Sequence, residues 1–248
     1  MSFNYRLLPY VDGSSLLSDV EDALHFMRSK SGLQDFLSVE APSTTINWEK
    51  VMVTGESAGG FLAAYTWLKS EMPLQVIYLR YPMLVQYQRE ARGYGGAHIS
   101  KDNYAEMVHC AMDEVERIKR SGEPMPAESS LLPPVNMPAA NIFSSTARWK
   151  DMFQHHDILQ MLQYEVRQPR SCPVVFVVHG EMDAACPIEN SIKFEEEINK
   201  RGWAKGPVNL VAVPDMDHAF DYNLNVGLKG VGWLGKLMPK VREAWVGE

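Results

Sequence analysis

The sequence predicts an α/β fold, with a mostly parallel sheet, flanking helices and one long helical insertion. Short apolar, β-branched runs alternate with helix-forming segments in both halves of the chain, which is typical of parallel sheets. The alternation stops between Pro82 and Ser171, where helical patterns and prolines replace strand patterns. At 248 residues and 46% hydrophobic content, the chain is long enough to bury one sizeable core.

The first part of the predicted core lies before the insertion. A short remnant strand at residues 2–6 leads to a helix at about 14–29, whose apolar residues recur on one face. A strand at 50–54, a helix at 57–70 and a strand at 74–79 follow. Because strands and helices alternate, we expect these strands to pair in parallel.

The insertion and the second part of the core complete the predicted order. Within the insertion we expect a helical stretch at about 101–120 and a second helical region at about 146–166, separated by a breaker-rich segment at 124–138. After the insertion, the pattern predicts a strand, a helix, a strand and a terminal helix, at 173–178, 189–201, 208–213 and 231–245.

The length of the insertion is typical of a lid that covers a site. We therefore predict a core formed by residues 1–81 and 171–248 and a helical lid formed by residues 82–170. Two interpretations of the methionines in the lid stay open. They form either an adaptable surface for a hydrophobic ligand or ordinary packing between lid and core, and we favour packing for most of them.

The most informative motif is the G-x-S-x-G sequence at residues 55–59. It lies between an apolar strand and a helix-forming run, and this context predicts a nucleophile elbow. The sharp turn strains the backbone of the serine, and the helix that follows points its positive end at any charge that develops there. Ser57 is therefore the candidate catalytic nucleophile.

A serine nucleophile needs an imidazole base and an acid that orients the base. Asp183 and His218 each lie just beyond the end of an apolar strand, in the chain order Ser, Asp, His that this type of site uses. Asp215 and Asp217 are closer to the histidine in sequence. Neighbours on the same turn seldom reach the far ring nitrogen, so Asp183 is the preferred acid and His218 the candidate base.

Several stretches give the chain a resemblance to the hormone-sensitive-lipase-like branch of the α/β-hydrolase superfamily. They are N-Y-R-L-L-P at residues 4–9, S-D-V-E-D-A-L at 18–24, G-E-S-A-G-G at 55–60, H-G-x-x-D-x-x-x-P at 179–187 and D-H-A-F-D at 217–221. The resemblance covers nearly the whole chain. It implies an α/β-hydrolase fold with a lid, and it implies Ser57 as nucleophile, Asp183 as acid and His218 as base.

One departure from the family pattern concerns the oxyanion hole. Members of this branch carry a His-Gly-Gly-Gly-type loop upstream of the segment that matches residues 4–9, and its N–H groups form half of that hole. Here we expect this loop and the first strands to be missing, which leaves the N–H of Ala58 as donor and the elbow strand with an open edge. Three explanations stay open: an incomplete gene model, self-association or a partner that covers the edge, and a changed function.

Composition narrows the function classes. A net charge of −7 and a pI near 5.5, without a basic patch, argue against nucleic-acid binding. We expect no membrane span and no signal peptide, and therefore a cytoplasmic protein. Three widely spaced cysteines suggest neither a disulfide framework nor a zinc site. The adjacent His155 and His156 point in different directions on a helix, so we expect no metal and no cofactor.

Two functional classes compete at this point. The first is a serine esterase for carboxylic esters with small or medium acyl chains, weakened by the absent oxyanion loop. The second is a hydrolase-derived protein that binds a ligand or partner, or that acts in small-molecule biosynthesis without efficient acyl transfer. A complete triad in the right order favours the esterase, whose partner would be a small-molecule ester or other hydrophobic ligand.

Overall fold

A computed structural model describes residues 1–29, 31–85, 104–124, 143, 148–164, 167–222 and 232–247. These residues form two compact units, each described by itself. The sheet unit comprises residues 43–85 and 156–248, and the helical unit comprises residues 1–42 and 86–155. The predicted division into core and lid stays a prediction. The breaker-rich segment, from residue 125 onward, lies outside the described residues, as do Met125 and Met137.

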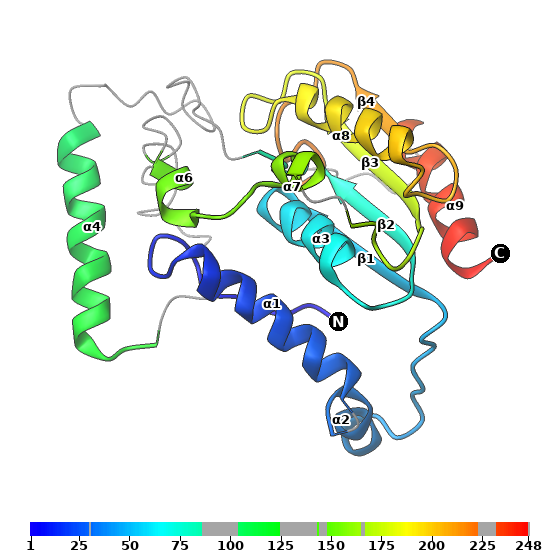
Figure 1. Cartoon of the computed structure of the whole chain (residues 1–248), viewed down its shortest axis with the longest axis horizontal. Coiled ribbons are helices and arrows are strands. Elements are labelled where there is room, and N and C mark those ends of the chain that lie inside the picture. The colour runs from blue at the N-terminus through cyan, green and yellow to red at the C-terminus, as the bar shows by residue number, and fades with distance from the viewer. Residues whose placement is uncertain are drawn as a thin grey trace. The chain divides into compact units, whose positions relative to one another are not determined.

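The sheet unit contains four parallel strands in the order β1-β2-β3-β4 (Figure 1). The strands are β1 Val51–Glu56, β2 Leu74–Arg80, β3 Val174–Gly180 and β4 Asn209–Val213. Helices connect or flank them, namely α3 Ser57–Lys69, α7 Ile158–Tyr164, α8 Ile188–Arg201 and α9 Gly232–Val246. The predicted fold class is therefore confirmed. In the described part of the chain, β1 pairs with β2 alone and forms one edge of the sheet.

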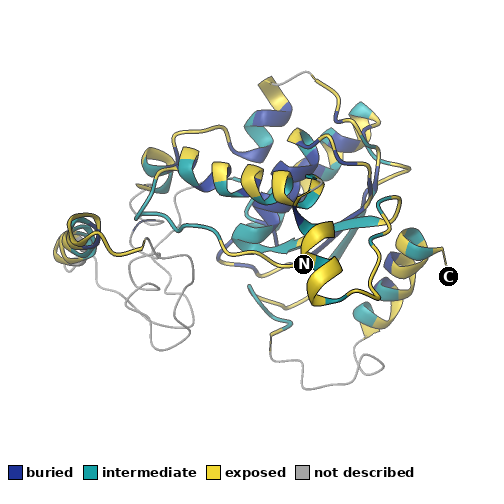
Figure 2. Ribbon diagram, turned by 90° about the horizontal axis from the view of Figure 1, so that it is seen from below, coloured by how far each residue is buried: buried dark blue, intermediate teal, exposed yellow. Residues whose placement is uncertain are grey.

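Side chains alternate between the two faces of the sheet, and each face is covered by helices. Val76 and Tyr78 of β2 pack with Val178 of β3 and with Leu237 and Val241 of α9. On the opposite face, α3 packs on β1 and β2, and α8 packs on β3 and β4. Figure 2 shows that buried residues gather in this layered region, while the outer helix surfaces are exposed. Both faces are apolar, as expected for a parallel sheet.

The helical unit contains α1 Gly13–Arg28, α2 Leu33–Glu40, α4 Tyr104–Ser121 and α6 Arg148–Phe153. Asp12 caps α1 by accepting a hydrogen bond from the N–H of Ser15, at 2.8 Å. Helix α2 is absent from the sequence-based prediction. It has only eight residues, no side-chain cap at Gly32, and exposed apolar side chains at Phe36 and Val39, so neither its length nor a capping residue marks it in the sequence.

The strand predicted at residues 2–6 is wrong, because these residues form no strand in the structure. Instead, the backbone N–H of Arg6 donates to Oδ2 of Asp19 at 2.8 Å, and its guanidinium pairs with the same carboxylate. The guanidinium also donates to the carbonyl of Ser15. The side chain of Asp19 on α1 thus accepts the backbone N–H that would bond to a neighbouring strand if residues 2–6 were in a sheet.

The second helical region, predicted at 146–166, contains two helices among the described residues, α6 and α7. Gln154 adopts a left-handed conformation, with φ 57°, and ends α6. Asp157 then starts α7, since its Oδ1 accepts the N–H of Gln160 and its own N–H donates to Oε1 of Gln160. This reciprocal pair is a capping box, which marks a new helix start.

The remaining helices and strands expected from the sequence are confirmed, with ends that differ by a few residues. Within the described residues, none of the helices combines the length and the apolar character needed to cross a membrane.

Candidate active site

The nucleophile elbow forms as expected, with β1 ending at Glu56 and α3 beginning at Ser57. Ser57 has φ 50°, a conformation that non-glycine residues rarely adopt. Two glycines permit the tight turn. A Cβ on Gly55 would lie 2.0 Å from the carbonyl oxygen of Gly59, and one on Gly60 would lie 2.6 Å from Cβ of Pro82. A Cβ on Gly59 would meet nothing within 4 Å, so packing does not require that glycine.

Asp183 follows β3, and its carboxylate is surrounded by N–H donors. Oδ1 accepts from the backbone N–H groups of Ala185 and Cys186, at 2.8 and 2.7 Å. Oδ2 lies 2.7 Å from Nδ1 of His218 and 3.2 Å from Nε2 of His179. Burial alone would raise the pKa of Asp183, but the hydrogen bonds from the two histidines and from the Cys186 N–H hold it well below its usual value. The group is therefore a stable anion.

His179 is fully buried at the end of β3 and helps to hold this carboxylate. Its Nε2 lies 2.7 Å from the carbonyl oxygen of Cys186, which can only accept, so Nε2 carries a proton. Its Nδ1 lies 2.8 Å from Oγ of Ser191, whose hydroxyl can donate to it. The motif at residues 179–187 contains both His179 and Asp183, but the sequence did not reveal that the two side chains are in contact. Cys186 is buried, as a small residue of that loop is expected to be.

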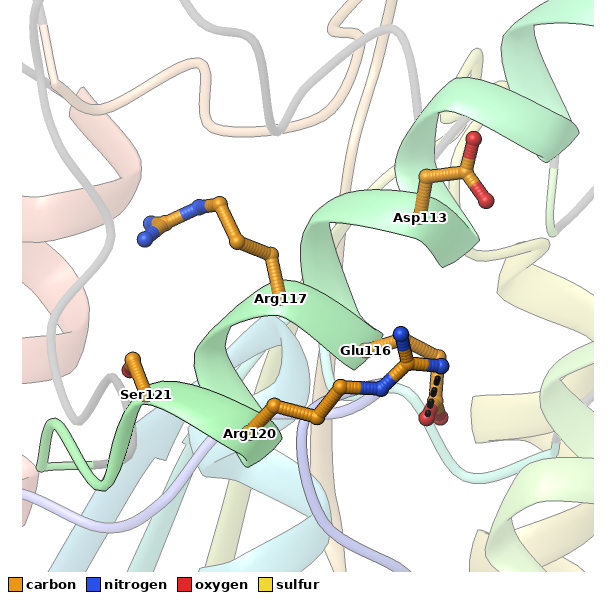
Figure 3. A pocket seen from close by; sticks show the side chains of 5 residues that line it. All are labelled: Asp113, Glu116, Arg117, Arg120 and Ser121. Carbon is orange, nitrogen blue, oxygen red and sulfur yellow. Dashed lines mark ion pairs between the residues drawn. The ribbon is translucent and has the colours of Figure 1, made fainter.

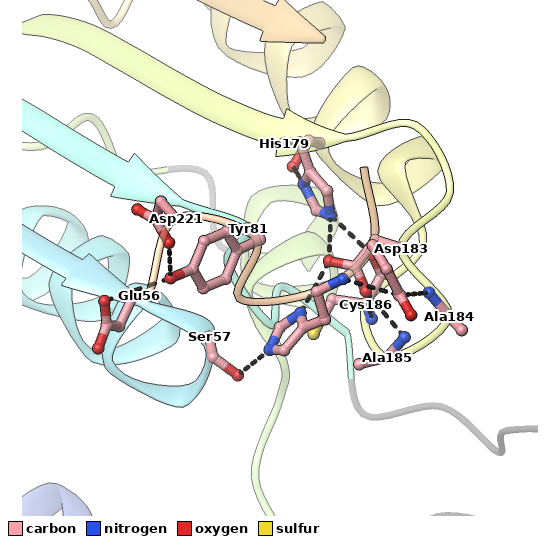
Figure 4. Close-up of polar contacts among 12 residues, drawn as sticks. Glu56, Ser57, Tyr81, His179, Asp183, Ala184, Ala185, Cys186 and Asp221 are labelled. Carbon is pink, nitrogen blue, oxygen red and sulfur yellow. Dashed lines mark hydrogen bonds and ion pairs between the residues drawn. The ribbon is translucent and has the colours of Figure 1, made fainter. Parts of the chain in front are cut away.

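His218 emerges beyond β4 and lies between the acid and the elbow. Its Nδ1 is 2.7 Å from Oδ2 of Asp183, and its Nε2 is 2.9 Å from Oγ of Ser57. Figure 4 labels Ser57 and Asp183 and marks the hydrogen bonds around them with dashed lines. A carboxylate can only accept, so Nδ1 carries the ring proton and Nε2 can accept the hydroxyl proton of Ser57. The structure thus brings the three residues singled out from the sequence into one hydrogen-bonded row.

Asp217, the nearest carboxylate to His218 in sequence, contacts backbone instead of the imidazole. Its Oδ1 accepts the N–H groups of Ala184 and His218, at 2.9 and 2.7 Å. The N–H of Met182 also donates to the carbonyl of Met216, at 2.9 Å. Asp217 therefore connects the loop that carries Asp183 to the loop that carries His218.

A second polar cluster, formed by Glu56, Arg80, Tyr81, Asp221 and Tyr222, was not predicted as a unit. Arg80 forms ion pairs with both Glu56 and Asp221, and the hydroxyl of Tyr81 donates to Oδ1 of Asp221 at 2.6 Å. Burial and this hydrogen bond raise the pKa of Tyr81, so its hydroxyl stays protonated. The sequence signal that could have indicated this cluster is Arg80, a charged residue at the end of the buried strand β2.

Backbone strain concentrates around the same strand ends. Among the described residues, five non-glycine residues have positive φ, and four of them lie in the sheet unit: Ser57, Tyr81, Asp215 and Ala219. They follow β1, β2 and β4, and two of them flank His218. Such conformations persist where the surrounding structure holds them, and they are common at functional sites.

The N–H of Ala58, the candidate oxyanion donor, lies in the first turn of α3. N–H groups of a first helical turn have no acceptor within the helix and point outward from its positive end. They can therefore stabilise a negative charge that develops next to Ser57.

A hollow of about 520 Å³ lies along α4 in the helical unit, but its lining residues suit surface pairing better than catalysis (Figure 3). Glu116 pairs with Lys119 and Arg120, and Arg117 pairs with Glu114 and Glu123. These side chains are largely exposed and partner their neighbours on the same helix or just after it. In the described residues, no group of three His, Cys, Asp or Glu side chains could hold a metal ion.

Comparisons with known proteins agree with this fold. Residues 1–141 match a family described as "alpha/beta hydrolase fold". No curated protein matches the chain in sequence. A protein of unknown function from Staphylococcus aureus subsp. aureus Mu50 is similar in structure, with 17% identity, a TM-score of 0.56 and coverage of 98% of this chain and 77% of that one.

Two structures that carry the name esterase are also similar. LipW from Mycobacterium marinum has 15% identity and a TM-score of 0.52, with 98% of this chain and 62% of that chain covered. Esterase 2 from Thermogutta terrifontis, phosphonylated by sarin, has 15% identity and a TM-score of 0.51, with 94% and 67% covered. At these identities the likeness concerns the fold alone. The matched family covers more than half of the sequence, and the chain belongs to the hormone-sensitive-lipase-like branch of the alpha/beta hydrolase fold family.

Proposed function

We propose that this protein is a serine hydrolase that cleaves carboxylic esters with small or medium acyl groups. The observation that carries the proposal is the row Ser57, His218 and Asp183, joined by contacts of 2.9 and 2.7 Å. A hydroxyl next to the unprotonated nitrogen of an oriented imidazole is the arrangement that acyl transfer requires.

In the proposed reaction, Oγ of Ser57 attacks the ester carbonyl while Nε2 of His218 takes its proton. The oxygen of the tetrahedral intermediate gains a negative charge, which the N–H of Ala58 and the first turn of α3 stabilise. His218 then protonates the leaving alkoxide, and the alcohol departs from an acyl-enzyme on Ser57. A water molecule, deprotonated by His218, attacks the acyl carbon and releases the carboxylic acid.

Asp183 has an electrostatic and orienting role in this scheme. It fixes the tautomer of His218 and stabilises the imidazolium that forms when Ser57 loses its proton. Because its pKa is held well below the usual value, the carboxylate stays ionised across the neutral range. The two donors on Oδ1, from Ala185 and Cys186, also prevent the carboxylate from rotating away from the ring.

The test is hydrolysis of p-nitrophenyl acetate and butyrate by the purified chain. The wild type should release p-nitrophenol, and Ser57→Ala should reduce the rate to that of the buffer. Ser38→Ala is the matched control, since Ser38 is an exposed serine of the helical unit and its loss should leave the rate unchanged. Hydrolysis that survives Ser57→Ala would overturn the proposal.

Substrate reactivity tests the finer part of the proposal, the strength of the oxyanion site. Loss of one oxyanion donor typically lowers kcat by about 10²–10³. If Ala58 acts as the single donor, activated p-nitrophenyl esters should be cleaved slowly and unactivated alkyl esters should be nearly inert. Turnover of ethyl butyrate at a rate within about tenfold of p-nitrophenyl butyrate would contradict a single-donor site.

A further inference from the structure

We propose that Tyr81, held by Asp221 and Arg80, is a positioning residue that fixes the imidazole of His218 against Ser57. This inference rests on the proposed function, because the position of the imidazole matters for acyl transfer. Its first support is a direct ring contact. The centroids of Tyr81 and His218 lie 4.8 Å apart with the ring planes at 65°, and Tyr81 is fully buried. The phenol ring therefore forms one wall of the space that the imidazole occupies.

The backbone of Tyr81 shows that the surrounding structure holds this wall in place. Tyr81 has φ 34°, which is unfavourable for a residue with a large side chain. Its N–H donates to the carbonyl of Val178 on β3, at 2.7 Å, and this bond anchors the residue to the sheet. Phe220 packs against the ring at a centroid distance of 5.7 Å. A strained residue that is fixed at both its backbone and its ring is a rigid support.

The hydroxyl of Tyr81 connects this support to the segment at residues 214–222, which follows β4 and carries His218. We call this segment the base loop. It donates to Oδ1 of Asp221 at 2.6 Å, and Asp221 lies three residues after His218. The other oxygen, Oδ2, pairs with Arg80 at the end of β2. The side chain of Asp221 is 6% exposed, and a carboxylate buried to this extent needs such partners. Tyr81 and Arg80 thus hold the base loop by one carboxylate.

The same network reaches the strand that carries the nucleophile. Arg80 also pairs with Glu56, the residue before Ser57, and Glu56 accepts a hydrogen bond from Tyr222 of the base loop (Figure 4 shows Glu56, Tyr81 and Asp221). The guanidinium therefore bridges the end of β1 to the base loop. A shift of the loop that carries His218 relative to the end of β1 would have to break at least one of these contacts.

The geometry separates positioning from catalysis. The Tyr81 hydroxyl donates to a carboxylate on the base loop, whereas the proton of Ser57 has Nε2 of His218 as its acceptor. Loss of the hydroxyl should therefore loosen the imidazole and lower kcat, while KM changes little. Misplacement of a reacting group by about 1 Å can lower a rate by about 10²-fold, so a loosened support should cost less than removal of a triad member.

The experiment compares Tyr81→Phe with Tyr78→Phe. Tyr78 is a buried tyrosine of β2 that packs in the core under α9, so it controls for the loss of a buried hydroxyl. With p-nitrophenyl acetate, Tyr81→Phe should lower kcat by about tenfold at unchanged KM, and Tyr78→Phe should leave kcat within about twofold. Equal kcat in the two variants would overturn the positioning role.

Variants of Asp221 test whether the tether acts as one unit. Asp221→Asn keeps an oxygen that can accept from Tyr81, so its loss in kcat should be smaller than that of Asp221→Ala. The double variant Tyr81→Phe/Asp221→Ala should be no slower than Asp221→Ala alone, because both changes remove the same hydrogen bond. Multiplicative losses would show that the two residues act separately and would contradict the tether. If Asp221→Ala fails to fold, the comparison of the two tyrosine variants still decides.

A spectroscopic measurement keeps this inference independent of ester hydrolysis. The proton between Nδ1 of His218 and Asp183 should give a low-field proton NMR signal in the substrate-free protein. Tyr81→Phe should broaden or shift this signal, and Tyr78→Phe should leave it as in the wild type. If the wild type hydrolyses no ester, the proposed function fails while this signal still tests the positioning. An unchanged signal in Tyr81→Phe would overturn the positioning role whatever the activity.

Discussion

The two units use the same kinds of charged residue in different ways. On α4 of the helical unit, Arg117 pairs with Glu114 and Glu123, and all three side chains are about half exposed. In the sheet unit, Arg80 pairs with the nearly buried Asp221 and with Glu56, and these residues come from three distant segments of the chain. Pairs of the first kind form between sequence neighbours in water and contribute little to stability. Pairs of the second kind exist only in the folded chain and fix segments relative to one another.

The carboxylates show the same difference. Asp183 is enclosed by four N–H donors, and two of these belong to histidines. Asp113, on α4, is exposed, and its Oδ2 lies 3.4 Å from Nε2 of the exposed His109, one turn earlier in the helix. Replacing an enclosed carboxylate removes the partner of several buried groups, whereas replacing an exposed one leaves water in its place. Matched substitutions in the two units therefore test this difference.

The largest difference is expected between Asp183→Asn and Asp113→Asn. The first leaves the size of the side chain unchanged but removes the charge that fixes the tautomer of His218, so kcat for p-nitrophenyl acetate should fall by about 10⁴. The second should leave kcat unchanged. Comparable kcat values for both variants would mean that Asp183 does not orient the base.

Alanine substitutions at two glycines of the elbow should change the stability of the protein in opposite directions. Gly60→Ala would place Cβ 2.6 Å from Pro82 and should destabilise the protein by about 1–3 kcal/mol, or roughly 2–4 °C in Tm per kcal/mol. In Gly59→Ala the added Cβ would have no neighbour within 4 Å, and alanine should stabilise α3 by about 0.5–1 kcal/mol relative to glycine. Thermal melts followed by circular dichroism measure both. A lower Tm for Gly59→Ala than for Gly60→Ala would contradict the packing described for this turn.

The low pKa of Asp183 predicts how stability depends on pH. A carboxyl whose folded pKa lies below its unfolded value of 3.8 stabilises the fold above that value, and it loses this contribution as pH falls toward the folded pKa. The free energy of unfolding should therefore fall more steeply below about pH 4 in the wild type than in Asp183→Asn. Urea titrations at several pH values measure the slopes, with Asp113→Asn as control. Parallel curves for the wild type and Asp183→Asn would count against the enclosed anion.

The smallest effect is expected on α4. Arg117→Gln removes two exposed ion pairs that water screens, so the Tm should stay within measurement error of the wild type. The same thermal melts measure it. A clear drop in Tm would show that the exposed pairs of the helical unit contribute more than their exposure suggests.

Local patterns explain why much of the sheet unit could be predicted. Apolar β-branched runs indicated the four strands, and the G-x-S-x-G motif between a strand and a helix indicated the turn at Ser57. Asp183 and His218 were singled out because each follows a strand, and parallel strands end at the same edge of a sheet. Each of these signals lies within a short stretch of sequence.

The parts that could not be predicted depend on contacts that no local pattern shows. Arg6 uses Asp19 where a strand partner was expected, and the capping of α7 by Asp157 begins a second helix within the predicted helical region. The contact of Tyr81 with His218 and Asp221 joins residues about 140 positions apart. Neither composition nor periodicity carries such information, because the partners become neighbours only when the chain has folded.

Covalent labelling by a fluorophosphonate tests whether Ser57 is an activated nucleophile. Such a probe reacts with a serine hydroxyl that a neighbouring base activates. The wild-type chain should carry one adduct, located by peptide mass spectrometry on the segment that contains Ser57. Labelling should disappear in Ser57→Ala and should slow markedly in Asp183→Asn. An adduct at another residue, or no adduct on the folded wild-type protein, would contradict the assignment of Ser57, His218 and Asp183 as an acyl-transfer site.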